Sequence, residues 1–142
     1  MNWCKVNYFF NMNEIFVYFC CMISKINIKP LSVNEAFKGR RFHTKEHKRW
    51  TENVLFMLPR NIIIPEPPFE IYLRFGFSST ASDWDNCIKQ VQDSLATKYS
   101  FNDKLIRRGV VETEIVPKGK EYFAFELTHY QPQTLSSLNI SE

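Results

Sequence analysis

The sequence predicts a single α+β domain with the element order β-α-β-α-β-β, in which two helices cover a small mixed sheet. Its 142 residues are about the length of one domain. Alternating apolar and polar residues predict strands, most clearly over 69–77, and apolar residues four apart predict a helix over 45–58. Apolar residues make up 44% and charged residues 23% of the chain, a composition that disfavours a disordered protein.

The first half of the domain is predicted as a strand, a loop and a helix. Residues 23–29 alternate and predict a strand that stops at Pro30, and residues 30–42 are predicted as a loop. Thr44 is a candidate N-cap for the helix over 45–58. The buried face of that helix is expected to consist of Trp50, Val54 and Leu58.

The second half is predicted as a strand, a helix and two further strands. The strand over 69–77 follows a proline-rich connector, and a helix is expected over 86–98, with Ile88, Val91 and Leu95 facing inward. Residues 101–106 are predicted as a connector. Strands over 110–116 and 122–127 follow, joined by a turn in which Gly119 supplies a positive φ.

Residues 1–24 differ in composition from the rest of the chain. Seventeen of the 24 are apolar, and they include three of the four cysteines. We interpret residues 1–21 as a non-native or disordered extension, residues 22–128 as the working domain, and residues 129–142 as a flexible tail. The alternative for the first segment is an added hydrophobic element or weak membrane anchor. Its apolar stretch 15–23 is shorter than the roughly 20 residues of a membrane span, and no membrane association is expected.

The cysteine and charge patterns limit the kinds of site and partner that the chain is expected to have. The cysteines at 4, 20, 21 and 87 include no C-x-x-C pair, so neither a zinc site nor a disulfide framework is expected. This cysteine usage favours a cytoplasmic location. Residues 25–60 carry nine Lys and Arg against three Asp and Glu, a pattern that suits phosphate binding or a solvated helix face. The candidate DNA-phosphate contacts are Lys38, Arg40, Arg41, Lys45, Lys48 and Arg49.

The most informative residues follow the strand over 69–77. In an extended segment Asp83 and Asp85 point to the same side, and two such carboxylates suit a hard cation such as Mg²⁺. Asp103 is a third candidate ligand if the chain folds back along the helix. The alternative is that Asp85 caps the helix and Asp103 occupies a turn, with Lys89 and Asp93 in a surface charge ladder. Trp84, between the two acids, is interpreted as a core residue.

Three segments of the sequence resemble the RusA family of Holliday-junction resolvases, which is common in phages and prophages. They are Lys29–Asn34 with Lys38–Phe42, then Asp83-x-Asp85-Asn86-x-x-Lys89, then Phe101–Ile106. The resemblance covers about residues 26–127 and implies a RusA-like fold. It also implies that Asp83, Asp85 and Asp103 are Mg²⁺-binding catalytic acids and that Lys89 is an active-site lysine. Asn86 matches a family position that we group with the DNA contacts.

The resemblance further implies a homodimer that nicks opposing strands of a four-way DNA junction, with Mn²⁺ as a substitute for Mg²⁺. We therefore expect a structure-selective endodeoxyribonuclease of DNA recombination and repair. Many relatives carry two adjacent acids in the third segment, whereas Asn102 precedes Asp103 here. One alternative is a non-catalytic protein, derived from a resolvase, that binds branched DNA without cutting it. Another is an interaction module whose acids only cap helices.

Overall fold

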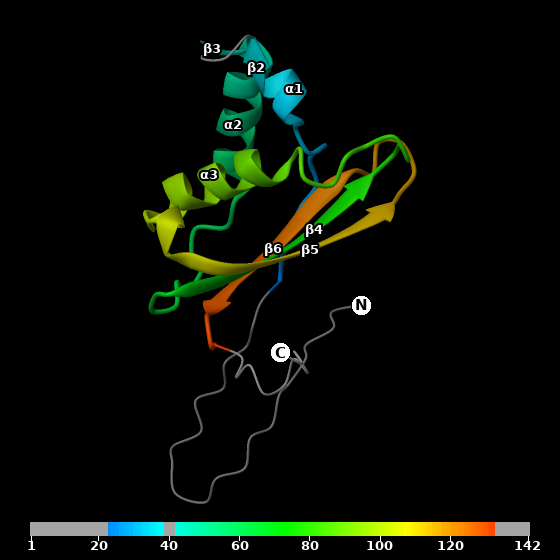
Figure 1. The fold of residues 1–142 in the computed structure, drawn as a ribbon. Coiled ribbons are helices and arrows are strands. Elements are labelled where there is room, and N and C mark those ends of the chain that lie inside the picture. The colour runs from blue at the N-terminus through cyan, green and yellow to red at the C-terminus, as the bar shows by residue number, and fades with distance from the viewer. Residues whose placement is uncertain (1–22, 39–41, 133–142) are drawn as a thin grey trace, which may run out of the picture.

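The computed structural model describes residues 23–38 and 42–132, and these form a small α+β fold (Figure 1). The elements are β1 (Ser24–Ile26), α1 (Val33–Ala36), β2 (Phe37–Lys38), β3 (Phe42–His43), α2 (Lys45–Met57), β4 (Phe69–Phe77), α3 (Ile88–Tyr99), the 3-10 helix η1 (Asp103–Leu105), β5 (Ile106–Ile115) and β6 (Tyr122–His129). The predicted α+β class with a small mixed sheet is therefore confirmed, whereas helix α1 and the short strands β2 and β3 were not part of the predicted element order. In the described ranges, no helix is long and apolar enough to cross a membrane.

A four-stranded sheet in the order β1-β6-β4-β5 forms the base of the fold, and the helices lie to one side of it (Figure 1). Strand β4 pairs in parallel with β5 and antiparallel with β6, and β6 pairs antiparallel with β1. Because β4 and β5 are parallel, the chain must cross over between them, and α3 makes that crossover. The β4–α3 loop and the α3–β5 turn therefore lie at the two ends of this one helix.

Helix α2 forms where the apolar spacing predicts it. The Thr44 side chain accepts a hydrogen bond from the backbone N–H of His47 at 3.0 Å, which confirms the predicted N-cap. Trp50, Val54 and Leu58 are all buried, as expected. The helix itself ends at Met57, and Leu58 is the C-cap residue.

The core lies between the helices and the sheet. Phe75 and Phe123, from the paired central strands, are fully buried, and Val91 and Leu95 of α3 pack in the same cluster. Ile88 is half-buried against that cluster. These contacts fix α3 on the sheet, so the two ends of the helix have defined positions above β4 and β5.

The first predicted strand and loop need correction. The strand over 23–29 is shorter than predicted, since β1 contains only Ser24–Ile26. The predicted loop over 30–42 contains α1 and the two-stranded β2–β3 ladder. Helix α1 begins with a capping box, in which the Ser32 side chain accepts from the Asn34 N–H and the Glu35 carboxylate accepts from the Ser32 N–H.

The last two strands are longer than predicted. Strand β5 begins at Ile106 rather than Val110, since it pairs with β4 from Phe69 onward. Strand β6 runs to His129, and the Tyr130 N–H donates to the Pro68 carbonyl at 2.8 Å. The fold therefore continues into the predicted tail. The predicted extension, 1–21, and residues 133–142 of the predicted tail lie outside the described residues.

Candidate active site

The loop from β4 to α3 holds the first two candidate acids. Asp83 accepts a hydrogen bond from the Asn86 side-chain amide at 3.0 Å, which holds that carboxylate toward the start of α3. Asp85 is exposed, and its backbone carbonyl accepts from the Ile88 N–H at 3.2 Å. The N-cap residue of α3 is Cys87, and it makes no side-chain cap bond. The interpretation of Asp85 as the helix cap is therefore wrong.

Trp84 does not belong to the core. It is 56% exposed, although it alternates with Asp83 and Asp85 in the sequence as an apolar residue of a strand would. The segment containing it is a series of bends and turns rather than a continuation of β4. The prediction of core packing for Trp84 is wrong because the strand ends at Phe77, six residues before Asp83.

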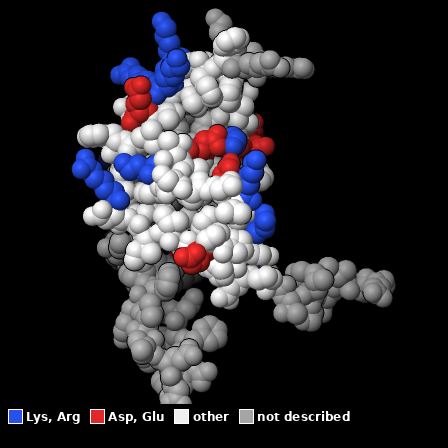
Figure 2. Space-filling view, turned by 90° about the vertical axis from the view of Figure 1, so that its left-hand side faces the viewer, with Lys and Arg blue, Asp and Glu red and all other residues white. Residues whose placement is uncertain are grey.

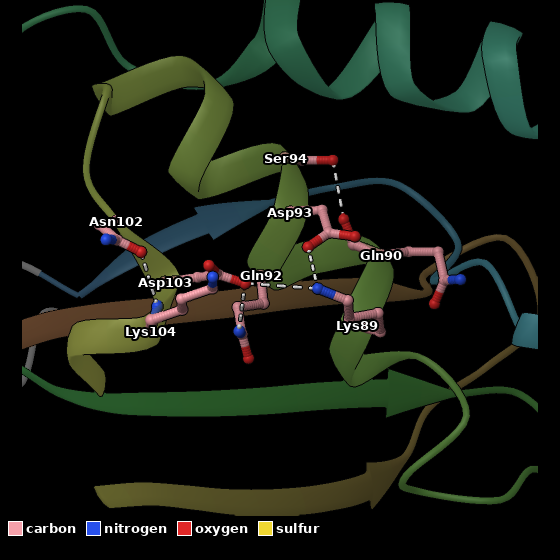
Figure 3. Close-up of polar contacts among 8 residues, drawn as sticks. All are labelled: Lys89, Gln90, Gln92, Asp93, Ser94, Asn102, Asp103 and Lys104. Atoms are coloured by element: carbon pink, nitrogen blue, oxygen red, sulfur yellow. Dashed lines mark hydrogen bonds and ion pairs between the residues drawn. The ribbon is translucent and has the colours of Figure 1, made fainter. Parts of the chain in front are cut away.

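The third candidate acid, Asp103, contacts polar side chains on α3 (Figure 3). The Lys89 ammonium donates to Asp93 Oδ1 at 2.5 Å and to Asp103 Oδ2 at 3.3 Å. Gln92 also donates to Asp103 Oδ2, at 3.3 Å. Asp103 is the first residue of η1, and this turn brings its carboxylate back to the first half of α3. Lys89 and Asp103 therefore meet beside the first turns of α3, the helix that begins three residues after Asp85.

Charge pairing favours the ionised forms of Asp103 and Lys89. The hydrogen bond from Lys89 lowers the pKa of Asp103 below its ordinary value, despite some opposing desolvation. The hydrogen bond to Asp93 raises the pKa of Lys89, and Asp103 adds to that effect. The site thus presents an ammonium between two carboxylates.

A hollow of about 250 Å³ lies between the loop and the segment that follows β1. The backbone N–H of Val33 donates to the Asn86 carbonyl at 2.8 Å, which ties the two segments together. The polar side chains lining the hollow are Lys29, Ser32, Asn34, Glu35, Ser82, Asp83 and Asn86. Parts of the first and second sequence segments that resemble resolvases therefore share one concave surface.

The described residues include no group of three or more His, Cys, Asp or Glu side chains placed to hold a metal ion. Asp83 and Asp85 share one loop, whereas Asp103 is paired with Lys89. The donor chemistry nevertheless suits Mg²⁺, which prefers carboxylate oxygens and keeps several water ligands. A cation held by Asp83 and Asp85 therefore needs water, or movement of Asp103, to complete its coordination.

The basic candidates are only partly described. Lys45, Lys48 and Arg49 are exposed on the first turns of α2. Lys38 lies in β2, while Arg40 and Arg41 fall outside the described residues. In Figure 2, acidic and basic side chains are mixed near the middle of the displayed face, and further Lys and Arg side chains gather above them.

Two features of this region were not predicted from the sequence. The rings of His43 and His47 stack with their centroids 4.0 Å apart, at the junction of β3 and α2. The hollow was also missed. The capping-box pattern at Ser32 and Glu35 is the one signal in the sequence that marks α1, which borders that hollow.

No protein-family model matches this chain, and no curated protein matches its sequence. The resemblance to resolvases therefore rests on the three sequence segments themselves.

Proposed function

We propose that this protein is a Mg²⁺-dependent, structure-selective endodeoxyribonuclease that resolves four-way DNA junctions by paired nicks. The observation that carries the proposal is the contact between Asp103 and Lys89. It joins the second and third resolvase-like segments on one side of α3, close in sequence to Asp83 and Asp85. Lys89 and Asp103, from two separate segments, are thus in contact, and Asp83 and Asp85 lie on the loop that leads into the same helix.

Each residue has a distinct role in this proposal. Asp83, Asp85 and Asp103 would hold Mg²⁺, or Mn²⁺ in its place, which lowers the pKa of a bound water and neutralises phosphate charge. Asn86 orients the Asp83 carboxylate through its amide hydrogen bond. Lys89 carries the positive charge that meets the scissile phosphate or the attacking hydroxide.

The basic residues supply affinity for DNA without reading its sequence. Lys45, Lys48 and Arg49 project from α2, and Lys38, Arg40 and Arg41 precede that helix in the chain. Such side chains contact phosphates and position the duplex arms. A homodimer would present two equivalent sites related by a two-fold axis, which suits paired nicks in opposing strands.

The test uses the full-length protein and an end-labelled four-way junction with Mg²⁺ or EDTA. We expect paired nicks with Mg²⁺ only, and none in linear duplex. Asp85→Asn should abolish nicking and spare junction binding, because it removes a charge but little volume. Glu52→Gln, at an exposed position on α2, is the matched control and should nick normally. Full activity of Asp85→Asn would refute the assignment.

Two observations favour a second candidate, a protein that binds branched DNA without cutting it. The Asp103 carboxylate is paired with Lys89, and the described residues hold no three-carboxylate metal group. This alternative predicts tight, salt-sensitive junction binding with no nicking in either Mg²⁺ or Mn²⁺. The same gel distinguishes the two candidates.

A further inference from the structure

We infer that Trp84 is a stacking platform for a base exposed at the branch point of the DNA. This inference rests on the proposed substrate, branched DNA, and it extends the site to a residue beyond the acids and the lysine. The indole is 56% exposed, on the loop that also holds Asp83 and Asp85. An isolated exposed apolar residue is ordinary on protein surfaces, so the position of Trp84 is what carries the inference.

The position of Trp84 limits what its ring can reach. Adjacent Cα atoms are about 3.8 Å apart, so the indole is bonded into the same short segment as both acids. Successive nucleotides in one strand are separated by about 3.4 Å along the duplex axis. A phosphate held at Asp83 and Asp85 through a divalent cation would therefore leave Trp84 within one or two nucleotides of the bond to be cut.

The ring is also free to stack. Within the described part of the chain, Trp84 makes no ring–ring or cation–π contact, and its indole N–H donates to no protein acceptor. Trp50 is the opposite case, since it is buried and its N–H donates to the Lys29 carbonyl at 2.8 Å. Stacking on an aromatic ring tolerates every base, which suits recognition of a branch by its shape.

The acids flanking Trp84 explain why stacking would depend on a divalent ion. Two carboxylates beside the indole repel the phosphates attached to any base that approaches it. A divalent cation between carboxylate and phosphate removes that repulsion. We therefore expect the base to stack on Trp84 in the presence of a divalent ion and much more weakly in EDTA.

The experiment measures tryptophan emission and junction affinity for the full-length protein in Ca²⁺, with the junction checked for integrity on a gel. Adding a four-way junction should quench the emission of the unsubstituted protein, and the Trp84→Phe protein should lack that component. Trp84→Leu keeps an apolar side chain but no ring, and it should bind the junction about 5- to 100-fold more weakly. Trp84→Phe should recover most of that affinity.

Phe56→Leu is the matched control, since Phe56 is 88% exposed but lies on α2. It should leave junction affinity unchanged. Equal affinities of the Trp84→Leu and unsubstituted proteins would overturn the inference, and so would equal quenching by a linear duplex.

Failure of the stacking role and failure of the proposed function give different results. If Trp84→Leu binds and nicks normally, the nuclease proposal stands and the platform is refuted. If the junction quenches Trp84 and Trp84→Leu binds weakly, but no Mg²⁺-dependent nicking occurs, the platform stands and the nuclease proposal fails.

Discussion

The ammonium of Lys89 lies 3.3 Å from the Asp103 carboxylate, although the two residues are separated by the rest of α3 and the turn that follows it. Lys89 also contacts Asp93, and Asp103 also accepts from Gln92, so the pair belongs to a four-residue network on one side of the helix (Figure 3). This network engages the carboxylate of the candidate third metal ligand. An acid paired with an ammonium stays ionised, but it must share its oxygens before it can bind a cation.

The first prediction concerns that pairing. Lys89→Met should raise the pKa of Asp103 toward its ordinary value, because the hydrogen bond from Lys89 is the largest cause of its lowered pKa. The lowered pKa stabilises the fold at pH values above 3.8, and that contribution is lost as the pH falls through the folded-state pKa. Carboxyl-detected NMR titration measures the change. Lys118→Met, in the turn before β6, should leave the Asp103 pKa where it is.

The second prediction concerns the register of the central strands. Gly76 on β4 lies opposite Tyr122 on β6, and a Cβ at Gly76 would lie 2.5 Å from two carbons of that ring. The ring cannot move easily, because it is buried, its hydroxyl bonds to Glu114, and the Lys25 ammonium lies 3.7 Å from its centroid. Gly76→Ala should therefore lower the free energy of unfolding by about 1–3 kcal/mol.

Gly109→Ala is the control for this substitution. A Cβ there would lie 3.7 Å from Ile71 Cγ2, an ordinary contact, so the change should destabilise far less. Urea denaturation of both variants gives the comparison, with a shifted midpoint and an unchanged slope expected for Gly76→Ala. Equal midpoints for the two variants would contradict the register of β4 against β6.

The third prediction concerns the stacked histidines. Burial lowers the pKa of His47 below 6.5, and the nearby His43 lowers it further, while Asp93 opposes both effects. Because the folded-state pKa is the lower one, the stabilising effect of the neutral ring is present above pH 6.5. It is lost as the pH falls through the folded-state pKa.

His43→Gln should raise the pKa of His47, because it removes the repulsion between the two rings. The imidazole proton shifts of His47, followed by NMR between pH 5 and 8, measure this effect. An unchanged or lower His47 pKa in His43→Gln would mean that the stacked arrangement is incorrect.

The sequence predicted the helices and strands in which apolar residues recur with a clear period. Strand β4 matches its predicted bounds because apolar residues alternate from Phe69 to Phe77, and the strand is buried on one face. Helix α2 matches closely because Thr44 caps it and three apolar residues recur four apart. Helix α1 has four residues and therefore no period, and β5 is an edge strand whose start carries charged Arg107 and Arg108.

The sequence nominated the residues of the candidate site but did not predict their arrangement. The alternation of Asp83, Trp84 and Asp85 predicted two acids on one side and a buried indole on the other. That inference needed an extended backbone, which the bends before α3 do not provide. The contact of Asp103 with Lys89 depends on the direction of the η1 turn, which local sequence patterns do not determine.

The last prediction concerns Asn102, where many resolvases carry a second acid. Its side-chain oxygen accepts a hydrogen bond from the Lys104 N–H at 3.0 Å, so Asn102 caps the turn that places Asp103. Asn102→Ala should remove the cap, lower the free energy of unfolding by about 1 kcal/mol and weaken nicking, because Asp103 is then less well held.

Asn102→Asp preserves an acceptor at the cap position, so it should retain the stability of the unsubstituted protein. It also adds a carboxylate beside Asp103, which should reduce the Mg²⁺ concentration needed for half-maximal nicking. Thermal melts and a Mg²⁺ titration of junction nicking test the two parts separately. A stable Asn102→Asp protein that requires as much Mg²⁺ as the unsubstituted one would show that Asp103 acts without help from its neighbour.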